Sequence, residues 1–280
     1  MAELKVTPER IYHLEFHPTV DKPLIFAGDK VGNLGILDAS GAGDKPDIST
    51  FQLHTRSIST FFIPPTAPES LYTSSYDTTV RRFDLNSGKS VELFVHPSEE
   101  GLSSVCALDD SCNNLIYSTL DGEVGMFDVR TENQKTDAWQ CSDKKIGGLH
   151  VLPTDRNYFA TASLDRTVKI WDLRNISAPI AEHTSRLSVS AAQWSRTGKL
   201  ATTSYDNTIK IYNPKLTHGG IKKDDAGVLV KKEEEDVIAF VKKEEDDARV
   251  SVKSEESASD DQIVMEPEHI IPHNCQTGRW

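Results

Sequence analysis

Short apolar segments alternate with turns along most of the chain, and one kind of segment recurs about every forty residues. Its clearest copy, at residues 159–172, reads FATASLDRTVKIWD and contains two β-rich runs on either side of a turn. The second run alternates from Val168 to Trp171, which places every second side chain on one face of a strand. The pattern predicts two short strands around a tight turn.

Related hairpins occur five times along the sequence. Their last residues are Asp38, Asp84, Asp128, Asp172 and Asn213, and the steps between them are 46, 44, 44 and 41 residues. A period of this size is typical of stacked or radial repeats. Four of the turns carry an aspartate, a residue type that hydrogen-bonds its own backbone in turns; these are Asp77, Asp121, Asp165 and Asp206.

Two further strands accompany each hairpin. An apolar segment precedes it, such as IGGLHVL at 146–152, and a fourth segment lies between units, such as SVELFVH at 90–96. Four strands per unit describe a propeller blade. We therefore expect an all-β fold, a β-propeller with five blades over residues 8–213.

Charge is unevenly distributed over the 280 residues. The net charge is −12: residues 1–216 hold 22 basic and 27 acidic side chains, and the last 64 residues hold 9 and 16. Nucleic-acid binding would therefore need a local basic patch. The four cysteines lack C-x-x-C spacing, which favours free thiols over a disulfide framework or a zinc site. With no apolar run near ~20 residues and no signal-peptide core, we expect an intracellular, soluble protein.

Catalytic motifs are missing from the sequence. It has no Gly-rich phosphate loop, no metal-ligand cluster and no nucleophile–base pair, and His150 and His218 are isolated. We expect no enzyme activity, no cofactor or metal, and neither a membrane nor a small molecule as partner.

The repeats resemble those of WD-repeat proteins. Trp171-Asp172 is a full signature, and Phe83-Asp84, Phe127-Asp128 and Tyr212-Asn213 are degenerate versions. The resemblance implies a buried hydrogen-bond chain in each blade, here His54, Ser75 and Asp77 in one blade and His183, Ser204, Asp206 and Tyr212 in another.

WD propellers most often close with seven blades, so the resemblance also implies that five of an expected seven are present. The expected plan is a five-bladed propeller at 1–216, a disordered acidic insert at 217–268, and the start of a sixth blade at 269–280, as in a fragment or a truncated product.

A narrower resemblance covers all five blades and resumes at the C-terminal end. The segments VTPERIYHLEFHP, SLDRTVKIWDLR and PHNCQTGRW are similar to fungal DNA damage-binding WD-repeat proteins, which are related to the small subunit of the UV-damaged-DNA-binding complex. The resemblance implies a nuclear protein, associated with chromatin, that binds DNA with a preference for UV-damaged duplex.

Basic residues recur just before the first strand of several units. Arg10, Arg56 and Lys145 each lie eight residues ahead of the proline that follows that strand. In the other two units the equivalent position is not basic. It is Ser188 in the last unit, two residues after Arg186, and Gly101 in the third unit, directly after two glutamates. Lys144 and Arg279 lie in the same kind of loop. Equivalent positions share one rim of a propeller, so we expect a cationic ring that neutralises phosphates; the alternative is ordinary solvated loop residues.

Arg279 and Trp280 suggest a second DNA contact. The resemblance places them in the loop that pushes side chains into a lesion, and an aromatic residue beside an arginine suits a wedge. The alternative is that Trp280 is a core residue of a further blade.

Two turns end in Asp-x-Arg, with Asp128 and Arg130 in one and Asp172 and Arg174 in the other. They are expected on the face opposite the ring, and similar boxes in WD proteins face the adaptor of a cullin-type ubiquitin ligase. An exposed Arg makes bidentate contacts with carboxylates. The alternative is that each Arg pairs with carboxylates of the neighbouring blade. A protein-interaction scaffold or ligase substrate receptor without DNA contact is thus the rival function.

Residues 222–268 are rich in Glu, Asp, Lys and Ser and almost free of aromatic residues, a composition that favours disorder. Within them VKKE, VKKE and VKSE recur every eleven residues and fit a consensus for attaching a small ubiquitin-like modifier to Lys231, Lys242 and Lys253. The alternative is a duplicated low-complexity tract.

Overall fold

Four four-stranded antiparallel sheets and one five-stranded sheet, in which the last strand is parallel, make up the five blades. The computed structural model describes residues 5–40, 47–131, 136–214, 216–217, 220–221 and 263–272, and every regular element within these ranges is a strand. Blades 1 to 3 contain β1 (Ile11–Phe16), β2 (Leu24–Asp29), β3 (Asn33–Asp38), β4 (Asp47–Gln52), β5 (Ile58–Phe62), β6 (Ser70–Ser75), β7 (Thr79–Asp84), β8 (Lys89–Val95), β9 (Leu102–Ala107), β10 (Asn114–Thr119), β11 (Glu123–Asp128) and β12 (Asp137–Gln140).

Blades 4 and 5 receive strands from beyond residue 214. Blade 4 contains β13 (Ile146–Val151), β14 (Tyr158–Ser163), β15 (Thr167–Asp172), β16 (Ala181–Thr184) and β22 (Ile263–Val264). Blade 5 contains β17 (Val189–Trp194), β18 (Leu200–Ser204), β19 (Thr208–Tyr212) and β23 (His269–Pro272). A separate pair joins β20 (Leu216–Thr217) to β21 (Gly220–Ile221).

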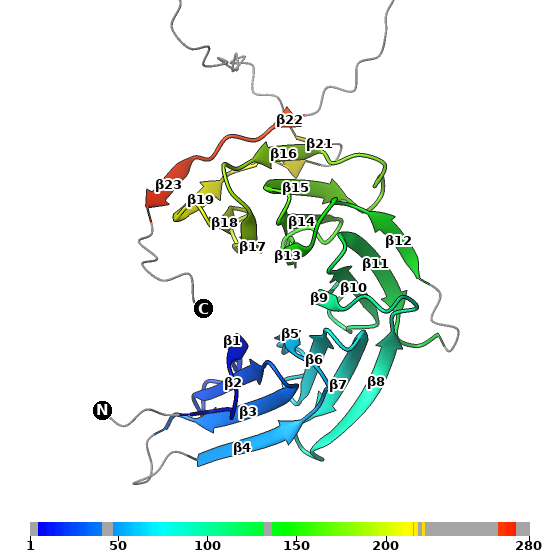
Figure 1. Cartoon of the computed structure of the whole chain (residues 1–280), viewed down its shortest axis with the longest axis vertical. Coiled ribbons are helices and arrows are strands. Elements are labelled where there is room, and N and C mark those ends of the chain that lie inside the picture. Colours follow the sequence, from blue (N-terminus) through cyan, green and yellow to red (C-terminus); the bar gives the residue numbers. More distant parts are fainter. Residues whose placement is uncertain are drawn as a thin grey trace, which may run out of the picture.

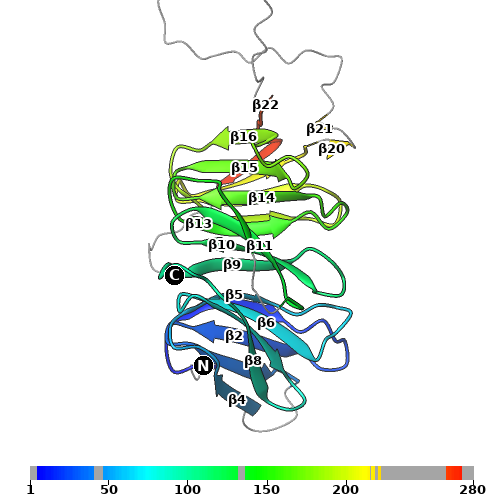
Figure 2. The same cartoon turned by 90° about the vertical axis from the view of Figure 1, so that its right-hand side faces the viewer.

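The blades follow one another around a central axis, with β1, β5, β9, β13 and β17 innermost (Figure 1). Seen from the side, the sheets stack face to face (Figure 2). The inner strand of each blade from the second onward contacts the first two strands of the blade before it. The predicted five-bladed propeller is confirmed.

Apolar side chains bury the surfaces between neighbouring blades. Phe26 and Leu34 of blade 1, for example, form one cluster with Ile58, Phe61 and Phe83 of blade 2. Comparable clusters join blades 2 and 3, blades 3 and 4, and blades 4 and 5. Because both faces of an inner blade must be covered in this way, its strands contain long runs of buried residues, such as all six of β14.

Within the described ranges, each of the two end blades packs against one other blade. On the free side of blade 1, Tyr12, Leu14 and Phe16 alternate along β1 and their residues are 44%, 51% and 63% exposed. In Figure 1 the described strands form an arc that begins with blade 1 and ends with blade 5.

The expected hydrogen-bond chain exists in blade 2. His54 Nδ1 donates to both carboxylate oxygens of Asp77, at 3.2 and 3.0 Å, and Ser75 Oγ accepts the Asp77 N–H at 3.1 Å. Burial alone would raise the pKa of Asp77, but the hydrogen bonds from His54 and Thr79 hold that pKa well below its usual value. The pair ties the loop before β5 to the turn after β6.

The prediction that His183 takes part in the corresponding hydrogen-bond chain of blade 5 with Asp206 is wrong. His183 lies in β16, and its Nδ1 donates to the Met265 carbonyl at 2.8 Å rather than to Asp206. Ser185 occupies the position that corresponds to His54. The backbone N–H of Ser185 donates to the Arg166 carbonyl in the turn of the preceding blade, just as the His54 N–H donates to the Gly32 carbonyl. Lys210 Nζ donates to Ser185 Oγ at 2.9 Å and lies 3.6 Å from Asp206, so a buried lysine replaces the histidine.

The other blades use different partners at the same place. In blade 3, His96 Nε2 donates to Glu123 at 3.0 Å. In blade 4, Ser142 Oγ donates to Asp165 at 2.5 Å. Blades 2 and 4 therefore join the loop before the inner strand to the turn aspartate. Blades 3 and 5 join that loop to the third strand instead, at Glu123 of β11 and Lys210 of β19.

Residues 263–272 correct the expected domain plan. β22 adds in parallel to β16 at the edge of blade 4, and Met265 is buried between blades 4 and 5. β23 then pairs with β19 and completes blade 5, so residues 269–272 do not begin a sixth blade. The reason is that β19 would otherwise be an edge with unpaired backbone groups, which β23 satisfies. Residues 263–268, expected in the acidic insert, also belong to the packed fold.

In the part of the chain that the structure describes, no helix is long and apolar enough to span a membrane. Across the same residues, no group of three or more His, Cys, Asp and Glu side chains is placed to hold a metal ion.

Replacing Asp77 by Asn should lower the free energy of unfolding by about 2–4 kcal/mol, because it weakens a hydrogen-bonded pair whose members are almost fully buried. Since the pKa of Asp77 is depressed in the folded state, its contribution is complete above the unfolded pKa near 4 and is lost as pH falls further. Urea unfolding at pH 6 and pH 3 measures both effects.

The matched control is Asp121→Asn, the same turn position in blade 3, where the aspartate is exposed and has no histidine partner. We expect a loss under about 1 kcal/mol there. Equal losses for the two variants would contradict a special role for the His54–Asp77 pair.

Candidate nucleic-acid interface

Two sets of loops meet at one end of the propeller. In each blade, one residue lies directly before the inner strand, and another begins the turn between the second and third strands. The backbone N–H of the turn residue donates to the carbonyl of the residue before the inner strand. The donor and acceptor pairs, at 2.9–3.0 Å, are Lys30 to Arg10, Tyr76 to Ser57, Leu120 to Gly101, Leu164 to Lys145 and Tyr205 to Ser188. These ten positions are therefore equivalent from blade to blade and lie on one face.

The sequence-predicted cations are brought to this face, but one is out of register. Arg10 and Lys145 share the position just before the inner strand. Arg56 lies one residue earlier, at the position of Lys144: the carbonyls of both lie against the turn glycine of the preceding blade, Gly32 or Gly122. The expectation that Arg56 matches Arg10 and Lys145 is wrong.

The shift has a simple cause. β5 has five residues and β1 and β13 have six, so counting back from the proline overshoots by one in blade 2. The residue in register is Ser57, which is buried. Arg186 lies two residues before Ser188 and is exposed, as are Arg10, Arg56 and Lys144.

Lys145 reaches across blade 3 to blade 2. Its Nζ donates to the Tyr76 hydroxyl at 2.7 Å and lies 5.2 Å from the centre of the Tyr76 ring, a cation–π distance. Blade 3 contributes only Gly101 at this register, and a Cβ there would lie 2.8 Å from the Tyr76 Cα. The close approach of Tyr76 thus explains why blade 3 lacks a cation at this position.

Sequence reasoning missed two cations of this face, Lys30 and Arg166, both exposed. Arg166 occupies the turn position with left-handed backbone, where its φ is 81°; the equivalents are Gly32, Thr78, Gly122 and Asn207. Lys30 is equivalent to Tyr76 and to Tyr205, which is 62% exposed. Both residues occupy recurring turn positions, so the repeat pattern at the turn identifies them in the sequence.

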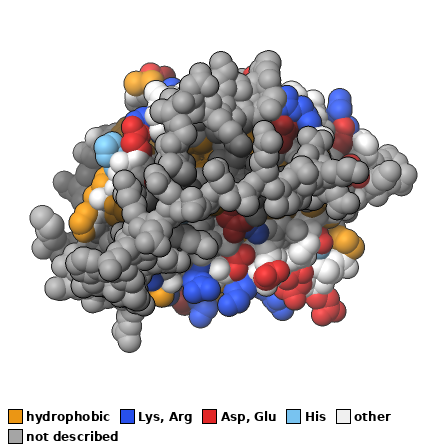
Figure 3. Space-filling view, turned by 90° about the horizontal axis from the view of Figure 1, so that it is seen from above, with side chains coloured by type: hydrophobic (Ala, Val, Ile, Leu, Met, Phe, Trp, Pro, Cys, Tyr) orange, Lys and Arg blue, Asp and Glu red, His pale blue; other side chains and the backbone are white. Residues whose placement is uncertain are grey.

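We call the set of basic residues on this face the cation arc: Arg10, Lys30, Arg56, Lys144, Lys145, Arg166 and Arg186. It draws on blades 1, 2, 4 and 5. Blade 3 instead presents exposed Glu99, Glu100 and Asp121. The arc is therefore interrupted rather than a closed ring. Seen from above, another side of the surface also carries Lys and Arg side chains close to Asp and Glu side chains (Figure 3).

The Asp-x-Arg turns lie at the opposite end, where third strands end. Arg130 donates to Asp128 through Nε at 2.9 Å and Nη2 at 2.6 Å. Arg174 makes the same pair with Asp172 and also donates to the Tyr158 hydroxyl at 2.8 Å. Each Arg therefore pairs with the aspartate of its own turn, not with a neighbouring blade, and the hydrogen bonds from Arg130 lower the pKa of Asp128 to about 2.

Five predicted residues lie outside the described ranges. They are the wedge candidates Arg279 and Trp280 and the modification candidates Lys231, Lys242 and Lys253. Their roles stay predictions.

Known proteins resemble this chain at two levels. The family description "WD domain, G-beta repeat" matches residues 136–172 and 176–213. Two curated relatives are named DNA damage-binding protein cmr1: one from Aspergillus clavatus is 40% identical over 99% of this chain and 51% of its own length, and one from Neurospora crassa is 39% identical over 99% and 51%.

A third relative, DNA damage-binding protein CMR1 of Phaeosphaeria nodorum, is 41% identical over 99% of this chain and 52% of its own length. The chain thus spans about half the length of these curated relatives.

Replacing Gly101 by Val should reduce the free energy of unfolding by about 1–3 kcal/mol, because the new side chain would collide with the Tyr76 backbone. The measurement is urea unfolding beside the control Glu100→Val, an exposed neighbour expected to change stability by less than about 0.5 kcal/mol. Equal stability of the two variants would contradict the proposed close packing.

Proposed function

We propose that this WD-repeat chain, which is related along 99% of its length to fungal DNA damage-binding proteins, binds duplex DNA with a preference for UV-damaged duplex. The observation that carries the proposal is the cation arc, which collects seven basic residues at one end of the propeller. Because the chain spans about half of its relatives, their activity comes to it only as a proposal.

Electrostatics gives the arc a mode of binding. Lys and Arg side chains that neutralise phosphates release condensed counterions, and this supplies affinity without reading sequence. The cations come from four blades, which spreads their contacts along a DNA backbone. The exposed acidic residues of blade 3 lie on the same face and repel phosphates, so the proposal places the backbone contacts on blades 1, 2, 4 and 5.

Preference for damage needs a feature that an intact duplex cannot satisfy. Tyr205 and Leu187 lie at the end of blade 5, 62% and 42% exposed, beside the exposed Arg186. An aromatic ring can stack on a base that a lesion has unstacked, which is worth about 1–3 kcal/mol per base. Among the residues that the structure describes, Tyr205 and Leu187 are our candidates for that contact.

The same proposal implies a non-catalytic protein that works in the nucleus and on chromatin, in DNA repair or another part of DNA metabolism. The WD-repeat propeller is in general a scaffold for binding, and the proposal asks of it only that it bind.

Purified protein should bind a duplex with an affinity that falls steeply as salt rises, and it should bind a UV-irradiated duplex more tightly than an untreated one. Reversing Arg10, Arg56 and Lys145 together to Glu should lower the slope of log affinity against log salt by about 2–3, near 0.9 for each lost phosphate contact. Fluorescence anisotropy with a labelled duplex measures both.

The control reverses three cations on the opposite face, Lys22, Lys89 and Arg196, which changes the net charge equally. A loss of slope in both triple variants would mean that only net charge matters, and the arc would then have no specific role. An affinity that is the same for irradiated and untreated DNA would remove the damage preference.

A second candidate function rests on the Asp-x-Arg turns. Arg130 and Arg174 come from neighbouring blades, and their side chains are 63% and 45% exposed although each is paired. We propose that this face contacts the adaptor of a cullin-type ubiquitin ligase, either alongside DNA binding or in its place.

Pull-down of the adaptor by the wild-type chain, and its loss with Arg130→Ala plus Arg174→Ala, is the expected result. A matched control is Arg82→Ala, an exposed cation of blade 2 outside the two turns. Retention of the adaptor by the double variant would mean that the two arginines serve only their own turns.

A further inference from the structure

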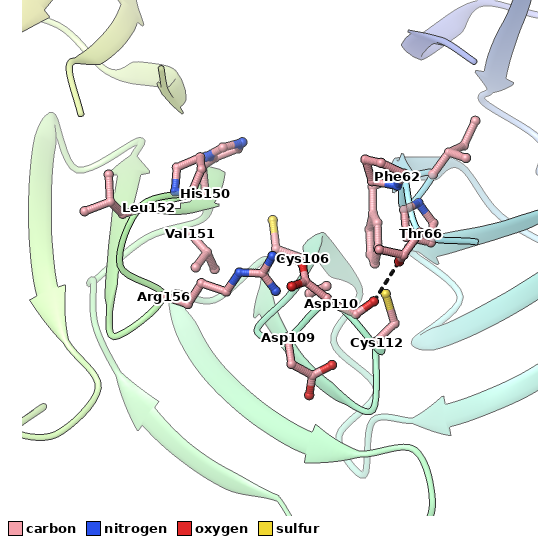
Figure 4. A pocket seen from close by; sticks show the side chains of 15 residues that line it. Phe62, Thr66, Cys106, Asp109, Asp110, Cys112, His150, Val151, Leu152 and Arg156 are labelled. Carbon is pink, nitrogen blue, oxygen red and sulfur yellow. Dashed lines mark hydrogen bonds and ion pairs between the residues drawn. The ribbon is translucent and has the colours of Figure 1, made fainter. Parts of the chain in front are cut away.

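A pocket of about 220 Å³ lies on the face opposite the cation arc. Its walls are the ends of the inner strands β5, β9 and β13 and the loops that follow these strands in blades 2, 3 and 4 (Figure 4). Neither the cation arc nor the Asp-x-Arg arginines line it.

The loops around the pocket are fixed to one another. Thr66 Oγ1 of blade 2 donates to the Asp110 carbonyl of blade 3 at 2.7 Å. The Asp110 carboxylate in turn pairs with the Arg156 guanidinium of blade 4. These contacts bridge three blades, so the pocket is present before anything binds and its loops need little ordering.

The interior of the pocket is apolar and uncharged. Phe62, Pro64 and Val151 line it, together with the thiols of Cys106 and Cys112. Burial raises the pKa of these thiols to about 12 and about 11, so both remain protonated. Burial also lowers the pKa of His150, which keeps that ring neutral.

A second pocket of about 430 Å³ adjoins the first and shares Asp109 and Arg156 with it. Leu108, Met126 and Leu173 supply its apolar side. Among the residues that the structure describes, the charged side chains lining the two pockets are Asp109, Asp110, Asp128, Asp137 and Arg156. Arg156 pairs with Asp110, and Arg130 pairs with Asp128. The pair of pockets is thus apolar inside and mainly acidic at the rim, and the Asp110 side chain is 78% exposed.

We propose that these two pockets form a docking site for a basic peptide segment of a partner protein, with an apolar side chain in the smaller pocket and a neighbouring Lys or Arg on Asp110. The size of the smaller pocket suits one aliphatic or aromatic side chain, and the rim supplies carboxylates for the flanking cation. A nucleic acid is disfavoured here, because its phosphates would meet the four aspartates.

The test pans a phage-displayed library of random heptapeptides against the purified 280-residue chain and measures binding of the selected synthetic peptides by fluorescence polarisation. The selected peptides should carry Lys or Arg close to Leu, Ile, Met or Phe. Asp110→Lys should weaken their binding by about tenfold or more, since it places a like charge at the contact. Thr66→Lys, on the other side of the rim, is a second exposed variant with the same expected direction.

The matched control is Asp21→Lys, the same charge change in the corresponding loop of blade 1, which should alter affinity less than about twofold. Melting temperatures check that each variant is folded. Selection of no peptide, selection of acidic peptides, or equal weakening by Asp110→Lys and Asp21→Lys would overturn the proposal. Displacement of the peptide by duplex DNA would overturn it as well, because the pockets and the cation arc occupy opposite faces.

Discussion

Burial of each inner strand against the preceding blade is the constraint on which the structure depends. A four-stranded sheet with two apolar faces is stable only when both are covered, and the neighbouring blades supply that cover, as Ile58 and Phe61 do for Phe26 and Leu34. Once the blades are stacked in this way, corresponding loops must fall at the same end of the molecule. Cations that are far apart along the chain, such as Arg10 and Lys145, are gathered by packing alone, without any direct attraction between them.

Packing fixes the position of each blade, but the link between loop and turn varies. The pairs His54–Asp77 and Ser142–Asp165 join the loop before the inner strand to the turn after the second strand. The pairs His96–Glu123 and Ser185–Lys210 join that loop to the third strand. What is common to all four is the backbone hydrogen bond from the loop to the turn residue of the preceding blade. The side chains at this junction can therefore differ from blade to blade while the loops that present Arg56, Lys144 and Arg186 keep their places.

Periodicity predicted the architecture because strand alternation and turn chemistry are local, and five hairpins forty-odd residues apart leave few other folds. Details that depend on one residue of length or on distant pairing were not accessible. The short β5 moved Arg56 out of register, and the place of His183 was misjudged because its partner, Met265, is remote in sequence. The role of Tyr76 in excluding a cation from blade 3 required the distance to Gly101. In the candidate interface, the cations of the loops before the inner strands could be predicted from the sequence. The two turn cations, Lys30 and Arg166, were overlooked.

The outer strand of blade 5 has a consequence for how the chain folds. In blade 4 the third strand ends at Asp172 and the fourth begins at Ala181, but in blade 5 these residues are Tyr212 and His269. The entropy of closing a connection grows by about 0.6 kcal/mol for each doubling of its length, so this blade starts roughly 1–2 kcal/mol behind the others. During synthesis on the ribosome, blades 1 to 3 can assemble completely while β19 still waits for its partner. Blade 5, and with it the Met265 contact to blade 4, is then the last part of the propeller to become native and the first expected to open.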